Sequence, residues 1–278
     1  MMKQPRVDSH QHFWRLERGD YHWLTKDLAT ICRDFEPADL RPHLEHAGVK
    51  KTILVQAAES EAETDYLLSL AENTDFIAGV VGWVDMENPR TPPRLQSLSR
   101  NMYLRGVRPM IPNLANPEWM LSKTLEPAFH TLIELDLSFD ALVFPHHLKH
   151  LLTLLQRHPR LRTVIDHGAK PNIASGHTAE WTDDIAAIAS ETQSYCKVSG
   201  LVTEAGDFAD VDGLSPYVQH LHQQFGAERL MWGSDWPVVN LSMDYSAWDR
   251  LSQQLLKPLP DAERQHILAD TATRFYRL

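Results

Sequence analysis

Cysteine is scarce in this chain of 278 residues, which contains only Cys32 and Cys196. The two lie far apart and in no metal-ligand spacing, so a disulfide framework is not expected and a reducing cytoplasm is the simplest location. Positive charge is also in short supply, because 27 Lys and Arg residues face 37 Asp and Glu residues, which gives a net charge of -10. With no basic stripe to offset this balance, a nucleic-acid partner is not expected.

Long apolar runs are missing as well. No run approaches the length needed to cross a bilayer, and residues 1–5 lack the apolar core of a signal peptide. We therefore expect a cytoplasmic protein without a membrane partner. The apolar content of 43% is enough for a well-filled globular core.

Two common enzyme motifs are absent. No Gly-x-Gly-x-x-Gly follows the first apolar stretch, which removes the usual dinucleotide-binding fold. No Gly-x-Ser-x-Gly occurs, so a serine nucleophile lacks support. Cys196 lies in an apolar run with no evident base beside it, and we expect a small core residue there rather than a nucleophile.

Apolar, β-branched runs recur along the chain with amphipathic segments between them. Strands are predicted over 6–12, 51–57, 76–84, 103–108, 137–143, 161–166, 195–201 and 229–233. Helices are predicted over 61–73, 117–135, 147–158, 183–193, 213–225, 244–256 and 261–276, the first opened by a capping box at Ser60–Glu63. Eight strands alternating with helices predict an α/β protein with a closed (β/α)₈ barrel, a single domain over residues 1–278. Residues 15–35 are long for a loop and could fold over the barrel mouth as a lid.

The first strand ends in Asp8-Ser-His-Gln-His12. Because side chains alternate along a strand, we expect Asp8, His10 and His12 to share one face. Two imidazoles at a strand end are poorly suited to an apolar core. They are well suited to holding a metal ion or polarising a carbonyl group.

Polar residues also stand at the end of nearly every other predicted strand. In a barrel of this kind they converge on one mouth, where the chemistry takes place. Singly, each has an ordinary structural explanation: a turn histidine, a helix cap, or half of an ion pair. Together they favour an active site; the residues are Gln56, Glu59, Trp83, Asp85, Arg108, Asp140, His167, Lys170, Lys197, Ser199, Glu204 and Asp235.

Three short motifs taken in order resemble the amidohydrolase superfamily, and its amidohydrolase-2 branch most closely. They are His10-Gln-His12, Asp166-His-Gly-Ala-Lys-Pro171 and Gly233-Ser-Asp-Trp-Pro237. His12-Phe-Trp14 with Tyr21-His-Trp23-Leu24 is similar to the L-fuconolactonase and L-rhamnonolactonase group. The resemblance implies a distorted (β/α)₈ barrel, in agreement with the strand count. It also implies roles for His10 and His12 as the first-strand pair, for His167 as the mid-barrel histidine, and for Asp235 as the proton acceptor.

The resemblance bears on metal content too. Members with two metals use a bridging carboxylated lysine or glutamate and one more histidine. No lysine ends the 137–143 strand and no histidine follows Lys197-Val-Ser-Gly-Leu-Val202, so two metals are not expected. This branch includes lactonases that work without metal, so no cofactor is obligatory. One Zn²⁺ held by His10, His12, His167 and Asp235 remains chemically allowed.

The predicted function is hydrolysis of a sugar (aldono-) lactone, L-fuconolactone-like, to the sugar acid. Asp235 is the predicted general base, and His10, His12, His167 and Arg108 polarise the carbonyl group. Further substrate contacts are expected from seven residues: Glu59, Asp140, Lys170 and Glu204 for the hydroxyl groups, with Trp14, Trp23 and Trp236 stacking on the ring.

Two alternatives stay open. One is a zinc-dependent decarboxylase of the same branch, which needs a tightly held metal. The other is a barrel that binds a sugar acid without turnover, although the complete set of His10, His12, His167 and Asp235 argues against it. The sequence is compatible with a homo-oligomer but does not fix the oligomeric state.

Overall fold

Eight parallel strands follow one another around a single sheet in chain order. In this computed structural model, which describes residues 5–176 and 179–278, their bounds are β1 Arg6–Gln11, β2 Val49–Val55, β3 Ile77–Gly82, β4 Leu104–Val107, β5 Ser138–Ala141, β6 Thr163–Ile165, β7 Tyr195–Val198 and β8 Leu230–Trp232. Backbone bonds close the ring beyond β8: the Asp235 N–H donates to His10 O (2.8 Å) and the His12 N–H to Trp236 O (2.7 Å). The predicted (β/α)₈ barrel is confirmed.

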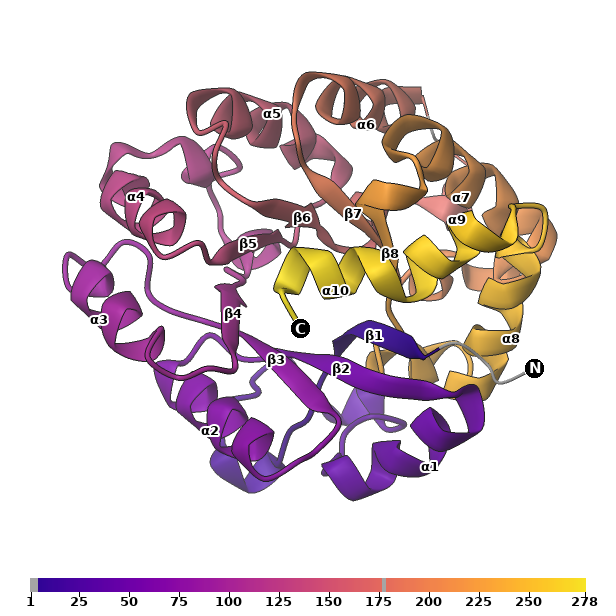
Figure 1. Ribbon diagram of the computed structural model, residues 1–278, viewed down its shortest axis with the longest axis horizontal. Helices are drawn as coiled ribbons and strands as arrows, with labels where there is room; N and C mark the ends of the chain where they lie inside the picture. Colours follow the sequence, from indigo (N-terminus) through magenta and orange to yellow (C-terminus); the bar gives the residue numbers. More distant parts are fainter. Residues whose placement is uncertain (1–4, 177–178) are drawn as a thin grey trace.

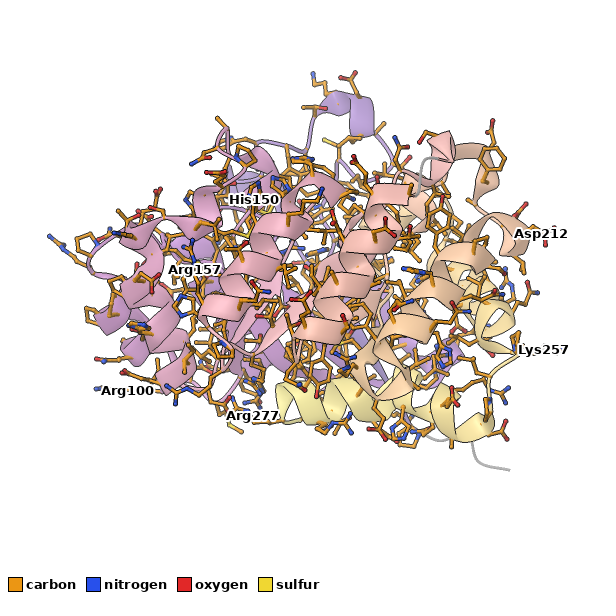
Figure 2. The ribbon with its side chains drawn as sticks, turned by 90° about the horizontal axis from the view of Figure 1, so that it is seen from above. Arg100, His150, Arg157, Asp212, Lys257 and Arg277 are labelled. Carbon is orange, nitrogen blue, oxygen red and sulfur yellow. The ribbon has the colours of Figure 1, made fainter. Side chains whose placement is uncertain are left out.

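Helices surround the barrel and cover one of its ends (Figure 1). The outer helices are α1 Pro37–Ala47, α2 Glu61–Glu72, α3 Thr91–Leu98, α4 Glu126–Glu134, α5 Leu148–Arg157, α6 Ala179–Glu191, α7 Val211–Phe225 and α8 Tyr245–Leu256. The chain then runs through α9 (Asp261–Gln265), a π-helical turn (His266–Asp270) and α10 (Thr271–Tyr276). In side view, Arg277 after α10 lies at one end of the barrel and His150 of α5 lies toward the other (Figure 2). The C-terminal segment therefore closes the end opposite the mouth.

Two helices that the sequence did not predict are rich in proline. Helix α1 contains Pro37 and Pro42, and α3 begins with Thr91-Pro-Pro93. Proline in the first turn costs a helix little, because the N–H groups there have no intrahelical partner, but Pro42 lies inside α1. The predicted helix over 117–135 is also interrupted. Two short 3₁₀ turns, Trp119–Leu121 and Lys123–Leu125, precede α4.

The strand register contradicts the predicted direction of Asp8. The pairing of β1 with β2 shifts between Asp8 and Gln11, which is the signature of a bulge. Asp8 consequently points outward, where its carboxylate accepts from the Tyr245 hydroxyl of α8 (3.2 Å) and from the Ser234 N–H (2.8 Å). The expectation that Asp8 shares a face with His10 and His12 was therefore wrong, because strict alternation fails at a bulge.

The capping box at Ser60 is only half present. The Ser60 hydroxyl accepts from the Glu63 N–H (3.0 Å), as predicted. The Glu63 carboxylate does not return to the cap. It accepts instead from the N–H groups of Ala57 and Ala58, at the end of β2.

The predicted lid, residues 15–35, connects β1 to α1. Its base is closed by a pair of backbone hydrogen bonds between Trp14 and Phe35 (3.0 and 2.9 Å). Both cysteines are free, as expected. Among the described residues, no helix combines the length and the apolarity needed to span a membrane.

The C-terminal helix reaches the barrel interior through Tyr276. Its buried hydroxyl donates to the Asp140 carboxylate (2.5 Å). We predict that Tyr276→Phe lowers the free energy of unfolding by about 1.5–3 kcal/mol, because this bond is to an ionisable group. Chemical denaturation measures the effect. Tyr195→Phe is the matched control, since that ring also packs on Phe275 but makes no hydrogen bond within the described part of the chain; equal losses for both variants would contradict the prediction.

Candidate active site

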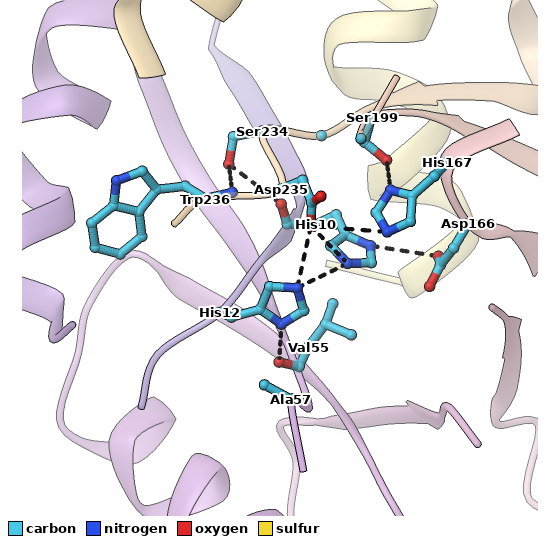
Figure 3. Close-up of polar contacts among 12 residues, drawn as sticks. His10, His12, Val55, Ala57, Asp166, His167, Ser199, Ser234, Asp235 and Trp236 are labelled. Atoms are coloured by element: carbon cyan, nitrogen blue, oxygen red, sulfur yellow. Dashed lines mark hydrogen bonds and ion pairs between the residues drawn. The ribbon is translucent and has the colours of Figure 1, made fainter. Parts of the chain in front are cut away.

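Three histidines and one aspartate from different strands meet at the barrel mouth (Figure 3). His10 and His12 come from the end of β1, His167 follows β6 and Asp235 follows β8. His12 Nε2 lies 3.2 Å from His10 Nε2 and 3.3 Å from Asp235 Oδ1. Asp235 Oδ1 also lies 3.7 Å from His10 Nε2 and 3.9 Å from His167 Nε2. All four side chains are at least 95% buried.

Unusual backbone conformations aim these side chains at one another. Asp235 and His167 both have positive φ values, 57° and 54°, which side-chain-bearing residues rarely adopt. Such conformations cluster at functional sites, where the surrounding structure enforces them. Gly200 makes room for the imidazole, because a Cβ there would lie 2.5 Å from His167 Nδ1.

Hydrogen bonds on the far side of each ring orient the imidazoles. His12 Nδ1 lies 2.8 Å from the Val55 carbonyl and must donate to it, so Nε2 is unprotonated in the neutral ring. His167 Nδ1 lies 2.9 Å from the Ser199 hydroxyl. The lone pair of His12 is thus presented to the centre of the site.

The electrostatics favour neutral imidazoles at His10 and His167 and an ionised carboxylate at Asp235. Burial lowers the pKa of His10 well below its usual value and lowers that of His167 to about 4. Burial alone would raise the pKa of Asp235, but the contacts with His167, His12 and His10 outweigh burial and lower it. Asp235 is therefore in the ionised form, which is the form that can accept a proton.

A buried ionic cluster lies behind His10. Lys197 Nζ lies 2.7 Å from Asp140, 2.9 Å from Asp166 and 3.2 Å from His10 Nδ1, and none of these side chains is exposed. Arg108 Nη1 joins the cluster, 3.3 Å from Asp166 and 3.2 Å from His10 Nε2. Burial opposes ionisation of Asp166, but Lys197, His10 and Arg108 hold its pKa well below the usual value.

The ligand atoms at the mouth have the spacing of a zinc site. With Zn–N and Zn–O bonds of about 2.0–2.1 Å, two ligands at a tetrahedral angle lie about 3.3 Å apart. The edges of the triangle of His10, His12 and Asp235 are 3.2, 3.3 and 3.7 Å, and these atoms form a candidate metal-binding group. The fourth predicted ligand, His167, stands 3.9 Å from the Asp235 oxygen. Three of the four predicted ligands thus fit one ion.

These groups face a cavity of about 180 Å³. The polar part of its wall is formed by His12, Arg108, His167, Lys170 and Asp235, and most of the remainder is apolar: Trp23, Met110, Pro112, Leu142, Phe144 and Val238. A small cavity with convergent polar groups on one side is typical of a site for a small molecule.

Comparison with known proteins places this chain in a family. Residues 7–278 match the family model described as amidohydrolase. The chain belongs to the amidohydrolase family. The resemblance read from the three sequence motifs is thereby confirmed.

Two curated relatives of this amidohydrolase-family chain carry the same name. It is 44% identical to an L-fucono-1,5-lactonase of Burkholderia ambifaria, over 98% of this chain and 96% of that protein. It is 33% identical to an L-fucono-1,5-lactonase of Burkholderia multivorans, with the same coverage. Crystal structures of an amidohydrolase from Burkholderia multivorans, one with bound HEPES and one with bound Zn, superpose with a TM-score of 0.93 at 33% identity, covering 99% of this chain and 100% of theirs.

Four of the predicted substrate-binding residues lie at or near the cavity. Trp23 and Lys170 line it, and Glu204 forms an ion pair with Lys170. Glu59 lies in an adjacent cavity, which shares Trp23 with the first, and accepts a hydrogen bond from Asn113 (3.0 Å).

The other three predicted substrate-binding residues lie elsewhere. Asp140 is enclosed in the barrel interior. Its carboxylate accepts hydrogen bonds from Lys197, Ser138 and Tyr276. Trp14 is fully buried and packs behind Trp23. Trp236 is 2% exposed and packs against phenylalanine rings. We therefore no longer assign these three a contact with substrate, because none has a face open to the cavity.

Two residues central to the site received no specific role from the sequence: Asp166, which was quoted only as part of a family motif, and Lys197, which was counted only among the strand-end residues. A signal for Lys197 existed, because a lysine in a buried strand is rare unless it is paired. Its partners Asp140 and Asp166 come from other strands, however, and only the closed barrel brings them together.

The buried cluster predicts strong coupling between Lys197 and Asp140. Lys197→Met should cost about 3–5 kcal/mol of stability, because it removes the buried partner of two carboxyl groups. The double variant Lys197→Met/Asp140→Asn should lose less stability than the sum of the losses in the two single variants. Chemical denaturation of all four proteins in a double-mutant cycle measures this coupling. The exposed pair Arg41–Asp75 is the control and should show little coupling; additive losses at Lys197 and Asp140 would contradict the prediction.

Proposed function

We propose that this protein hydrolyses a sugar lactone, an aldonolactone resembling L-fucono-1,5-lactone, to the free sugar acid. The observation that carries the proposal is the ionised Asp235 carboxylate beside His10, His12 and His167 at the wall of a small cavity. Two L-fucono-1,5-lactonases related over nearly the whole chain support the choice of substrate class.

Asp235 acts as the general base. It accepts a proton from a water molecule whose oxygen attacks the lactone carbonyl carbon. When the ring C–O bond breaks, the proton passes from Asp235 to the departing alkoxide oxygen. The Asp235 backbone N–H, which donates to the His10 carbonyl (2.8 Å), holds Asp235 in position for both transfers.

Positive charge and N–H donors stabilise the oxyanion that forms on the carbonyl oxygen. Arg108 is the source of charge at the cavity wall, and its position is fixed by Asp166 and by the Gln56 carbonyl. We assign His10 and His167 to the same polarisation of the carbonyl group, whereas His12, whose Nε2 carries no proton in the neutral ring, would contribute only through a bound metal ion. Because Arg108 is buried, its field acts with little screening by water.

One metal ion is compatible with the site, and His10, His12 and Asp235 would hold it. When bound, Zn²⁺ would act as a Lewis acid on the carbonyl oxygen and would lower the pKa of a bound water. We infer that hydrolysis does not require it, because Arg108 already places a cation 3.2 Å from His10 Nε2.

The cavity matches one monosaccharide ring. Its volume is about 180 Å³, and the adjacent cavity that contains Glu59 shares Trp23, Ala57 and Met110 with it. Lys170 and Glu204 at the rim suit sugar hydroxyl groups, and Trp23 suits the ring face. The apolar wall at Met110 and Leu142 suits the methyl group of a deoxysugar lactone. We also propose a cytoplasmic location, with which the two free thiols are compatible.

Replacing the general base should abolish most of the activity. For Asp235→Asn we expect kcat/KM for L-fuconolactone to fall by about 10²–10⁴-fold, because the amide cannot accept the proton from water. A pH-indicator assay measures turnover, and circular dichroism checks the fold. Asp212→Asn, at an exposed aspartate of α7, should behave as the unmodified protein. Near-normal turnover by Asp235→Asn would exclude the assignment.

Removing metal should leave hydrolysis in place. We predict that protein stripped with a chelator, and shown by elemental analysis to hold no zinc, opens the lactone at a rate close to that of zinc-loaded protein. Loss of activity with recovery on adding Zn²⁺ would show that the metal is obligatory. Release of carbon dioxide from an unsaturated acid would favour the decarboxylase alternative instead.

A further inference from the structure

The hydrolysis described above makes no use of Glu63, although this glutamate is completely buried near the mouth. It lies in the first turn of α2 and does not line the cavity. Burial raises its pKa to about 7, while hydrogen bonds from Ala58 and Ala57 act in the opposite direction. A buried carboxyl group costs stability unless its contacts compensate, so those contacts indicate what it is for.

Glu63 continues the hydrogen bonding of β2 past the end of the sheet. The last ladder bond of β2 runs from the Gln56 N–H to Val81 O (2.8 Å). The next two N–H groups donate to the Glu63 carboxylate: Ala57 N lies 3.0 and 3.1 Å from its two oxygens, and Ala58 N lies 2.8 Å from Oε2.

The two peptide units held in this way carry carbonyl groups that bind active-site side chains. In the unit joining residues 56 and 57, the Ala57 N–H donates to Glu63 and the Gln56 carbonyl accepts from Arg108 Nη2. In the unit joining residues 57 and 58, the Ala58 N–H donates to Glu63 and the Ala57 carbonyl accepts from Trp23 Nε1 (2.7 Å). Since each peptide unit is rigid, fixing the N–H fixes the direction of the carbonyl.

We propose that Glu63 is a positioning residue of the active site, which fixes Arg108 and Trp23 through the peptide units on either side of Ala57. The proposal rests on the proposed lactone hydrolysis, because Arg108 and Trp23 line the cavity for that substrate. Charge-assisted hydrogen bonds are stronger than neutral ones, and bonds at both ends of one peptide unit reinforce each other. One carboxylate therefore sets the position of both a cation and an aromatic wall.

The chemistry of the contact requires a carboxylate. Both Glu63 oxygens accept N–H groups, so an amide of the same shape would place an NH₂ donor against a backbone donor. In Glu63→Gln we expect the peptide units to turn and both carbonyl groups to move. A shift of about 1 Å in a positioned group can cost on the order of 10²-fold in rate, so we expect kcat/KM for the lactone to fall by about 10–100-fold.

A double-mutant cycle separates positioning from a general loss of structure. Trp23→Phe keeps an aromatic wall but removes the N–H that reaches Ala57. We expect Trp23→Phe to reduce kcat/KM in the native background and to have little further effect in Glu63→Gln, because the carbonyl is then already displaced. Additive losses, or wild-type kcat/KM in Glu63→Gln, would overturn the proposal.

Two controls come from the same helix. Thr64→Val removes a buried hydroxyl that bonds to the Trp83 backbone (2.7 Å to both N and O), which does not line the cavity. It should lower the melting temperature and leave kcat/KM unchanged. Glu61→Gln, at a partly exposed pair with Arg94, should change neither. A fall of kcat/KM in Thr64→Val equal to that in Glu63→Gln would assign the effect to stability alone.

A readout independent of turnover distinguishes this proposal from the function on which it rests. Hydrogen exchange measured by mass spectrometry should show the peptide containing Ala57 and Ala58 to be protected in the native protein and exposed in Glu63→Gln. If the native protein opens no lactone but this change in exchange appears, only the proposed function fails. If the lactone is opened and exchange is unchanged in Glu63→Gln, only the positioning role fails.

Discussion

The ammonium group of Lys197, enclosed inside the barrel, is the interaction on which the site depends. It binds Asp140 and Asp166 and lies beside His10, with Arg108 completing the cluster. Isolated charges are too costly to bury, and these are tolerated only because each lies against a partner of opposite sign. The cluster links strands β4 to β7 with β1, so the charges that hold the barrel interior together also fix His10, the first histidine of the candidate site.

Burial also influences the protonation states of the side chains at the barrel mouth. Removal from water keeps His10 and His167 neutral, while contacts with them help to keep Asp235 ionised. A neutral imidazole and a carboxylate side by side can accept and return a proton without either group being trapped as an ion pair. In the hydrolysis that we propose, one aspartate serves in both directions of proton transfer, and Arg108 supplies positive charge for the oxyanion.

The sequence indicated the barrel and its chemistry better than the details of packing. Apolar β-branched runs identify strands because burial on both faces demands them, and strand-end polar residues identify the mouth. Helices α1 and α3 were missed because proline disfavours a helix interior, and the sequence alone does not show that Pro37, Pro92 and Pro93 lie in first turns or that α1 accommodates Pro42. Asp8 was misplaced by a bulge that no local pattern reveals.

The substrate residues show the same limit. Asp140 and Trp236 stand beside strand ends as Asp235 does, but the direction of a side chain depends on register and on neighbours far away in sequence. Glu63 illustrates the reverse case. Its position after Ser60 predicted a role in a helix cap. Only the folded structure shows that its carboxylate accepts hydrogen bonds from the N–H groups of Ala57 and Ala58. Long-range partners of this kind require the three-dimensional structure.

The central claim is that Asp235 activates water rather than attacking the lactone itself. A single turnover in H₂¹⁸O with enzyme in excess over lactone, followed by mass spectrometry of the sugar acid, tests this most directly. Activated water predicts one ¹⁸O in the product carboxylate from the first turnover, with none in the released hydroxyl group. A first-turnover product without ¹⁸O, with the label appearing only on later turnovers, would show that an enzyme carboxylate is the nucleophile and would contradict the claim.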